Sequence, residues 1–195
     1  MTVRDPASAR STPRYGEGRE ALLAAAVHVV ATTGLRNLTY RAVAREAQVT
    51  HGLVAHHFGT RDALIKAALQ FSVENSVTSI STRPGTGDVT AIFAGLIQMV
   101  EDHPDDQAFQ YELILESRRR PELRPQVEAL YQTYRTALRT ELAHGGIHCD
   151  EAMAHMFIAA ADGLIFQQLI LGHSDFNAAA LEHLRRLFEM IRDQG

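Results

Sequence analysis

The sequence predicts an all-α protein in which a small three-helix domain at the N-terminus precedes a larger helical bundle. Apolar residues recur every three to four positions in most segments from about residue 17 onwards, which is the spacing of an amphipathic helix. Segments rich in glycine, proline and polar residues separate these periods, and no segment shows the alternation typical of a strand. With 195 residues, 46% of them hydrophobic, the chain is long enough to form a core in both parts.

The first domain is expected to follow a flexible arm. Residues 1–15 are rich in Ser, Thr, Pro and Arg and carry no apolar periodicity, as is typical of a disordered terminus. From about Glu17, leucine, alanine and valine recur at helical spacing, and Gly34 supplies the left-handed residue that commonly ends a helix. We therefore assign residues 1–15 to the arm, 16–66 to the first domain and 67–195 to the second.

Two short helices with a tight connection are predicted next. Thr39 can cap a helix that runs to about Glu46, and Thr50 can cap a third helix over residues 51–57. A short, exposed helix that follows another after a tight turn is the arrangement that places a recognition helix in the DNA major groove. Residues 16–66 are therefore predicted to form a helix-turn-helix DNA-binding domain.

The remaining helices form the predicted C-terminal bundle. Gly59 and Thr60 separate the third helix from a fourth, which we extend to about Ser79 and expect to join the two domains. Residues 81–88 are a cluster of turn formers and the clearest loop in the chain. Further helices are predicted at residues 88–102, 105–119, 121–144, 150–172 and 176–193, separated by prolines and glycines.

Charge is distributed unevenly between the two domains. The chain has a net charge of −4, but residues 1–66 contain nine Lys and Arg against five Asp and Glu, whereas residues 67–195 contain ten against eighteen. A basic domain on an acidic body attracts a polyanion to one end and repels it from the other. The asymmetry is consistent with DNA as the partner of the first domain.

The run TYRAVAREAQVTHGLVAHHFGTRDAL, residues 39–64, resembles the signature of the TetR family of transcriptional regulators. The similarity extends without gaps over about residues 19–66, and the segment GLVAHHF is most similar to the subgroup of choline-responsive repressors. This chain has Ala55 where the family commonly has a tyrosine that contacts phosphate, and Arg61 where it usually has lysine. The matching positions are Gly34, Thr39, Ala44, Ala47, Val49, Thr50, Gly52, His57, Phe58, Thr60, Arg61 and Leu64.

The resemblance implies a repressor that a small-molecule effector of unknown identity releases from DNA. In the C-terminal part, the segments at residues 111–113, 121–124 and 162–164 are similar to one broad subgroup of the family. A symmetric dimer presents two recognition helices to successive major grooves about 34 Å apart, so the operator is expected to be an approximate palindrome. The expected partners are therefore double-stranded DNA, a small molecule and a second copy of the chain.

The candidate DNA-binding residues lie on the second, third and fourth predicted helices. Hydroxyl and imidazole groups on the third helix can bond base edges or phosphates, and Leu53 can touch a thymine methyl group. The N-terminus of the second helix favours a phosphate oxygen. For His56 and His57 the alternative is a pair at a helix end, one of them packed on Phe58. The predicted contacts are Thr39, Tyr40, Arg41, Thr50, His51, Leu53, His56, His57 and Arg61.

An effector cavity is expected between the bundled helices. Most aromatic side chains there are expected to be core, with some of them lining a pocket. Polar side chains among the candidates could orient a ligand, and the alternative is an internal hydrogen-bond network or exposure to solvent. The predicted pocket residues are Phe93, Ile97, Phe109, Glu112, Tyr131, Tyr134, His155 and Phe157.

The last two helices are predicted to form the dimer interface. Both carry long apolar faces, and small residues on the first of them allow close approach of helices, so two copies could form a four-helix interface. An intramolecular core is the alternative for half of this face. The predicted interface residues are Met156, Ala159, Ala160, Gly163, Leu164, Gln167, Leu184, Leu187, Phe188 and Ile191.

Zinc binding and catalysis find less support in the sequence. His144, His148, Cys149, Asp150 and His155 surround one bend, but their spacing is not that of a compact zinc module. Residues 85–87 lack the following lysine of a phosphate-binding loop, and no nucleophile and base are paired. We predict no metal, no cofactor and no enzymatic activity.

The chain also lacks the features of an exported or membrane protein. A single cysteine cannot form an internal disulfide, no secretory signal is recognisable, and no uninterrupted apolar run approaches the roughly 20 residues that span a bilayer. We therefore expect a cytoplasmic protein without membrane contact. Two alternatives to an effector-controlled repressor stay open: a helix-turn-helix protein controlled by a protein partner, and a helical enzyme or metal protein.

Overall fold

The computed structural model describes residues 15–80, 85–172 and 174–192, and within these ranges the chain is all-α with no strand. The predicted arm at residues 1–15 lies almost entirely outside the described residues. The elements are α1 (Tyr15–Thr33), the 3₁₀ turn η1 (Leu35–Asn37), α2 (Tyr40–Glu46), α3 (His51–Phe58), α4 (Arg61–Ile80), α5 (Val89–Asp102), α6 (Pro104–Glu116), the 3₁₀ turn η2 (Pro121–Leu123), α7 (Arg124–His144), α8 (Glu151–Leu171) and α9 (Ser174–Arg192).

Side-chain caps explain several of these boundaries. The hydroxyl of Thr39 accepts a hydrogen bond from the backbone N–H of Ala42 at 3.1 Å, and the carboxylate of Asp150 accepts one from Met153 at 2.8 Å. Thr50 occupies the N-cap position of α3, but its side chain makes no capping hydrogen bond. Helix α3 therefore begins after Thr50 as predicted, but the exposed Thr50 side chain does not cap it.

Two boundaries of the helices in the C-terminal part differ from the prediction. Helix α6 stops at Glu116 rather than at residue 119, because the amides of residues 118–120 bond back to carbonyls of the last turn. The following helix begins with the 3₁₀ turn η2 instead of a regular α-helical turn. The short turn η1 between α1 and α2 carries no apolar period and was not predicted.

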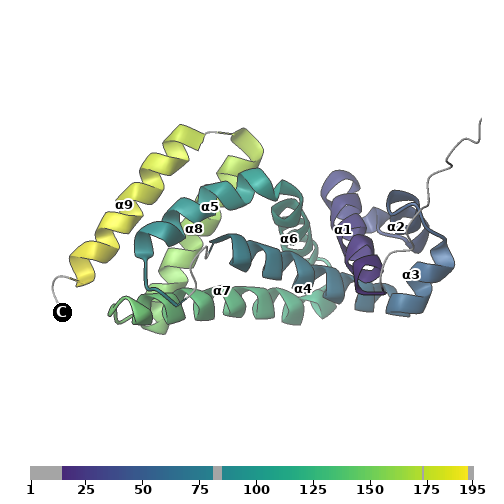
Figure 1. Ribbon diagram of the computed structural model, residues 1–195, viewed down its shortest axis with the longest axis horizontal. Helices are drawn as coiled ribbons and strands as arrows, with labels where there is room; N and C mark the ends of the chain where they lie inside the picture. Colours follow the sequence, from purple (N-terminus) through teal and green to yellow (C-terminus); the bar gives the residue numbers. More distant parts are fainter. Residues whose placement is uncertain (1–14, 81–84, 173, 193–195) are drawn as a thin grey trace, which may run out of the picture.

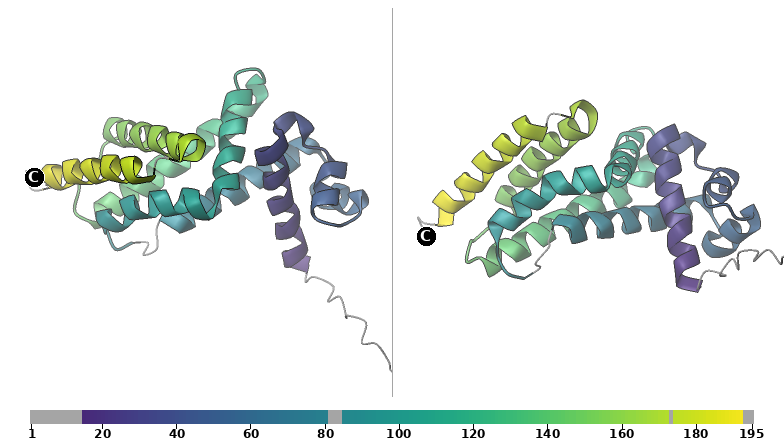
Figure 2. Two further views of the ribbon diagram at one scale, coloured as in Figure 1. Left: turned by 90° about the horizontal axis from the view of Figure 1, so that it is seen from above. Right: turned by 45° about the horizontal axis from the view of Figure 1, so that its top comes forward.

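The molecule is elongated, with α1, α2 and α3 at one end and α9 at the other (Figure 1). Helices α4 and α7 run side by side along its length and contact one another. Helix α1 stands across this direction and packs against α6, as both views in Figure 2 show. The end with α1 to α3 is therefore attached to the bundle through α4 and α6.

A single hydrophobic cluster connects the two predicted domains. Its buried residues include Leu22, Val30 and Val54 from the N-terminal helices together with Phe109 and Leu113 from α6. A second cluster at the other end joins α7, α8 and α9 around Leu142, Phe157 and Leu181. The core thus continues across the expected boundary at residue 66, and α4 is not the only link between the two parts.

The glycine-rich loop before α5 has a packing role. An added Cβ on Gly87 would lie 2.1 Å from the backbone nitrogen of Gly145, so only glycine permits this approach to the end of α7. The backbone N–H of Gly85 donates to the carboxylate of Glu141 at 2.6 Å. Packing against the end of α7, rather than phosphate binding, therefore explains the glycines at positions 85 and 87.

Candidate functional site

Helices α2 and α3 form the exposed reading head of the molecule. Val43 and Val54 are fully buried and fix the two helices against α1 and α4. The turn between them contains Gln48 with φ of +55°, a left-handed conformation that allows the tight connection. The opposite face of α3 carries His51, Leu53 and His56, all exposed to solvent. This geometry is that of a recognition helix ready to enter a major groove.

Most of the predicted DNA-binding side chains are exposed to solvent, and the others contact residues of the chain itself. Arg41, Thr50, His51, Leu53 and His56 are exposed. Thr39 is exposed as well, although its hydroxyl caps α2. His57 is half-buried, with its ring centroid 6.1 Å from that of Phe58.

Two of the predicted DNA contacts also make contacts within the chain. The Arg61 guanidinium donates to the carbonyl oxygens of Leu38 at 2.9 Å and Leu35 at 2.6 Å, so it fastens the η1 turn to the start of α4. Tyr40 packs against the hydrophobic cluster, and its hydroxyl oxygen is buried. Sequence reasoning could not foresee these contacts because η1 itself was not predicted.

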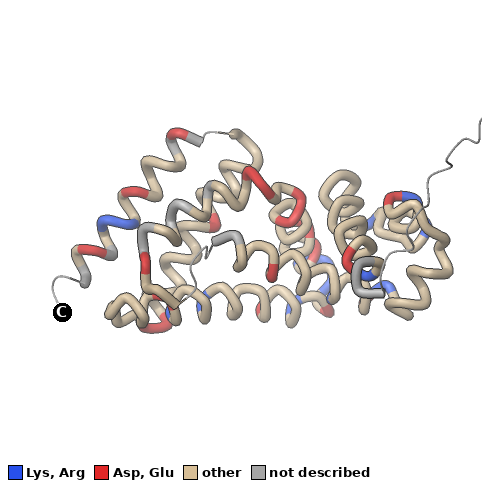
Figure 3. The backbone as a smooth tube through the Cα atoms, in the orientation of Figure 1, with Lys and Arg blue, Asp and Glu red and all other residues tan. Residues whose placement is uncertain are grey.

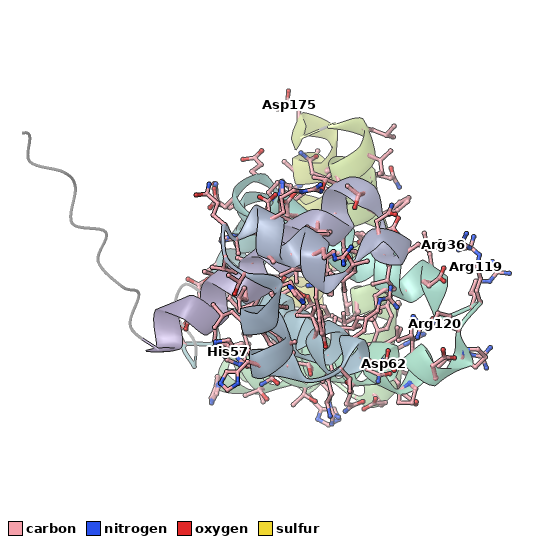
Figure 4. All side chains as sticks on the ribbon, turned by 90° about the vertical axis from the view of Figure 1, so that its right-hand side faces the viewer. Arg36, His57, Asp62, Arg119, Arg120 and Asp175 are labelled. Carbon is pink, nitrogen blue, oxygen red and sulfur yellow. The ribbon has the colours of Figure 1, made fainter. Side chains whose placement is uncertain are left out.

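Arginines collect beside the reading head. A groove of about 620 Å³ between α1 and α2 is bordered by Arg36, Arg41 and Arg45, with Glu46 as its one acidic neighbour. Figure 4 looks at this end of the molecule and shows His57 on one side and Arg36, Arg119, Arg120 and Asp62 on the other. In contrast, acidic residues are spread over the bundle, including the end of α5 and the start of α6 (Figure 3). Among the described residues, arginines thus gather beside α2, whereas acidic residues are spread over the bundle.

Polar contacts link the N-terminal helices to the bundle. His28 of α1 lies 2.6 Å from a carboxylate oxygen of Asp105 on α6 and 3.8 Å from one of Glu46 on α2. The hydrogen bond with Asp105 raises the pKa of His28 above its usual value of 6.5. A second pair joins Arg120 to Asp62 on α4 at 3.5 Å. These pairs connect the N-terminal helices to α6 and to the segment that follows it.

A small cavity of about 50 Å³ lies between α5, α6, α7 and α8. Asp162 of α8 is the acidic residue in its wall, and its two carboxylate oxygens accept hydrogen bonds from Tyr111 at 2.9 Å and Tyr131 at 3.0 Å. Burial and the nearby Asp162 raise the pKa values of both tyrosines above the ordinary range. The lining residues are Leu96, Met99, Gln107, Gln110, Tyr111, Ile114, Leu130, Tyr131, Tyr134, Ile158, Ala161, Asp162 and Ile165.

A buried hydrogen-bond network connects this cavity to α4. Tyr134 donates to the side-chain oxygen of Gln110 at 2.8 Å, and burial raises the pKa of Tyr134 to about 12. The Gln110 amide lies 3.3 Å from the hydroxyl of Ser72 and 3.2 Å from that of Ser76. Both serines are fully buried on the helix that begins beside the reading head. Cavity wall and α4 thus share one network.

Only some of the predicted pocket residues border this cavity. Tyr131 and Tyr134 do, whereas Phe109 belongs to the core shared with the reading head and Phe157 to the second core cluster. His155 is exposed on α8. Glu112 faces η1, where its carboxylate lies 3.3 Å from the backbone nitrogen of Leu35. These four assignments to the cavity are corrected accordingly, and the side chains of Phe93 and Ile97 lie outside the described part of the structure.

The residues that sequence reasoning missed are Asp162, Tyr111, Gln107 and Gln110. Periodicity assigns positions to an inner face but does not say which helices meet across a cavity. One signal was available for Asp162, because it is the only acidic residue beyond the first turn of the apolar helix α8. A charge in the interior of an otherwise apolar segment has to be compensated or used.

An exposed apolar face covers α8 and α9. Met156, Phe166, Ile170, Leu171, Leu187 and Met190 are large hydrophobic side chains exposed to solvent. Among the predicted interface residues, Met156, Ala159, Gly163, Gln167 and Leu187 are exposed, while Ala160, Leu164 and Leu184 are half-buried. The side chains of Phe188 and Ile191 are not among those described.

Helix α8 is long and apolar enough to cross a membrane by length and composition, but this single helix is weak support for a membrane span. The mean hydropathy of its most apolar window is 1.4, and only 22% of that window is buried. An apolar helix with so little burial is the surface expected of a protein interface. We therefore treat the face as a candidate contact with another chain.

The five candidate zinc ligands are not assembled. Across the described residues, no three His, Cys, Asp or Glu side chains lie close enough together to hold a metal ion. Asp150 caps α8, and burial raises the pKa of the Cys149 thiol, which disfavours the thiolate that would bind zinc.

The reading head, the helical bundle behind it and the apolar end face define a helix-turn-helix regulator of transcription. Residues 22–68 match the family described as "Bacterial regulatory proteins, tetR family", and residues 84–190 match "Tetracyclin repressor-like, C-terminal domain". The chain belongs to the TetR family.

Curated relatives match over about a third of the chain. The transcriptional regulator BetI of Paraburkholderia phytofirmans is 32% identical over 65 residues, 33% of each chain. The transcriptional repressor Rv3405c of Mycobacterium tuberculosis is 40% identical over 73 residues, 35% of this chain and 37% of the relative. The similarity thus spans about a third of the length of these relatives.

Solved structures are similar over nearly the whole chain. A putative TetR-family regulator from Rhodococcus sp. has a TM-score of 0.74 and 26% identity, covering 91% of this chain and 99% of that one. A TetR-family member from Streptomyces coelicolor has a TM-score of 0.69 and 29% identity, covering 88% of this chain and 98% of that one. The multidrug binding protein EbrR complexed with imidazole has a TM-score of 0.64 and 26% identity, covering 89% of this chain and 96% of that one.

Proposed function

We propose that this regulator is a homodimeric repressor that a small-molecule effector releases from a palindromic operator. One observation carries the proposal: α4 begins beside the reading head and shares a buried hydrogen-bond network with the cavity through Gln110, Ser72 and Ser76. A ligand that enlarges the cavity must disturb this network. Because α4 and α6 both pack against α1, the reading head is displaced with them. The repressor then acts on DNA in the cytoplasm and performs no catalysis.

The exposed residues of α2 and α3 form the proposed DNA contacts. Arg41 and the capped N-terminus of α2 hold phosphate, whereas His51 and Leu53 reach base edges. Two reading heads must stand about 34 Å apart to reach successive major grooves, which requires the dimer. The apolar face of α8 and α9 provides the contact between the two copies.

The small-molecule branch of the proposal is supported by the similar structure of EbrR. EbrR was crystallised with imidazole, proflavin, malachite green and ethidium. The cavity of the present chain is far smaller than the roughly 300 to 1,000 Å³ of usual ligand pockets. Binding is thus coupled to opening, and a coupling of about 2.7 kcal/mol lowers operator affinity about 100-fold.

The experiment is fluorescence anisotropy with labelled DNA from upstream of the protein's own gene, across a salt series and with unrelated DNA as the control. We expect preferential binding to one approximately palindromic segment with a steep negative salt slope. A screen of small molecules then seeks one that releases this DNA. Intact dimers that prefer no neighbouring promoter contradict the repressor, and release by a protein alone favours control by a protein partner.

A further inference from the structure

The carboxylate of Asp162 has no cationic partner in the described structure. Its two oxygens are bonded to the hydroxyls of Tyr111 and Tyr131, which are neutral donors. The salt bridges of the described residues involve other carboxylates, and α8 contains no Lys or Arg. The negative charge of Asp162 is therefore hydrogen-bonded but not neutralised.

The tyrosines hold this carboxylate in place and leave its charge intact. Because burial and Asp162 disfavour a phenolate, Tyr111 and Tyr131 stay protonated and keep donating to Asp162 at neutral pH. Tyr111 packs edge-on against Phe166 with a centroid separation of 5.0 Å, which restricts its ring. Two aromatic rings thus flank the carboxylate in a fixed arrangement.

The rest of the lining selects for an apolar body. Met99, Ile114, Ile158 and Ile165 line the cavity together with the aromatic side chains. An anion would be repelled by Asp162, and a neutral ligand that displaced water from this half-buried carboxylate would leave its charge uncompensated. A cation is attracted both by the carboxylate and by the tyrosine faces.

We propose that the effector is an organic cation with an apolar body, whose positively charged group binds against Asp162 between Tyr111 and Tyr131. The assignment rests on the proposed function, because it gives the chemical class of the ligand for the same regulated cavity. The cavity of about 50 Å³ accommodates a small charged group, and the apolar body has to separate the surrounding helices. Opening on this side reaches Gln110 and Tyr134, and through them α4.

The experiment is isothermal titration calorimetry on the full-length protein without DNA. Three ligands of similar shape are compared at neutral pH: 2-phenylethylammonium as the cation, 2-phenylethanol as the neutral analogue and phenylacetate as the anion. We expect the ammonium to bind at least about tenfold more tightly than the alcohol, and the anion to bind most weakly.

Variants of Asp162 identify the group responsible. Asp162→Asn keeps the shape and one acceptor oxygen but loses the charge and the second acceptor, and should bring the ammonium to within about threefold of the alcohol. Asp162→Glu keeps the charge and should keep the order of the three ligands. Glu128→Gln removes an exposed carboxylate of α7 outside the cavity lining and serves as the matched control, with the order unchanged. Thermal unfolding of each variant verifies the fold.

Each outcome decides the assignment. An ammonium that fails to bind at about 10 mM, binds no better than the alcohol, or loses nothing in Asp162→Asn overturns the cationic effector. Because no DNA is present, this result is independent of the repressor function. If an uncharged compound releases the operator, the repressor function is supported but the cationic effector is not. If the protein binds no operator but prefers the ammonium, the cation site is supported but the repressor function is not.

Discussion

The side chain of Glu112 on α6 reaches the backbone of Leu35 in η1, with 3.3 Å between the carboxylate oxygen and the amide nitrogen. The η1 turn leads directly into α2, so this bond ties the reading head to a helix of the C-terminal bundle. On the other side of η1, Arg61 binds the carbonyl oxygens of Leu35 and Leu38. The η1 turn is thus held by Arg61 of α4 on one side and by Glu112 of α6 on the other.

Glu112→Ala should loosen this attachment. The amide of Leu35 loses its partner in a half-buried position, which should cost about 1 kcal/mol of unfolding free energy. We expect weaker operator binding as well, because the reading head becomes less well oriented. Urea unfolding and DNA anisotropy measure the two effects. Glu112→Gln retains an oxygen acceptor and should lie close to wild type, and equal losses in both variants would show that the charge, not the hydrogen bond, matters.

Phe109 tests whether the two domains unfold together. It is fully buried in the cluster that also contains Leu22 and Val54 of the N-terminal helices. Phe109→Ala should cost about 3 to 5 kcal/mol through lost burial and the cavity left behind. The loss should appear in one transition that reports both parts of the chain, whereas Phe109→Leu should cost less. Two separated transitions in the wild-type protein would contradict a shared core.

The helices could be predicted from the sequence, but the contacts that give the site its character could not. Periodicity and capping residues located α2 and α3 to within a residue, because those signals are local. The partner of Arg61 is a pair of carbonyls in a turn that has no periodic signal. Glu112 was placed in a cavity because it is polar on a bundle helix, although it faces η1. Such roles depend on which helices meet in three dimensions.

His28 should make stability depend on pH near neutrality. The hydrogen bond to Asp105 raises the pKa of His28 in the folded protein, so the protonated form is the one that folding stabilises. This contribution is fully present below the ordinary histidine pKa of about 6.5 and is lost as the pH rises through the raised value. The difference in melting temperature between wild type and His28→Gln should therefore be larger at about pH 5.5 than at about pH 8.5. An equal difference in melting temperature at the two pH values would show that His28 does not contribute to the pH dependence of stability.

Ile170 lies on the exposed apolar face of α8 and should report the dimer. Its side chain is 62% exposed in the single chain, which is unfavourable unless a partner covers it. Ile170→Asp places a charge in the proposed interface and should shift the protein from dimer to monomer in size-exclusion chromatography with light scattering. Leu115→Asp is the matched control, because Leu115 is 55% exposed on α6, outside both helices. A wild-type monomer, or a dimer that survives Ile170→Asp, would place the contact elsewhere.

Arg41 and His51 should affect DNA binding in different ways, because one is proposed to position the protein and the other to read sequence. Arg41→Gln removes a phosphate contact, so affinity should fall for operator and unrelated DNA alike, and the slope of log K against log salt should decrease by about one. His51→Ala removes a base contact and should cost about 1 to 3 kcal/mol on the operator, with little change in slope. Anisotropy on both DNAs at several salt concentrations separates the two effects. If Arg41→Gln lowers only the preference for operator DNA, Arg41 contacts bases rather than phosphate. If His51→Ala lowers the affinity for both DNAs equally, His51 does not read the sequence.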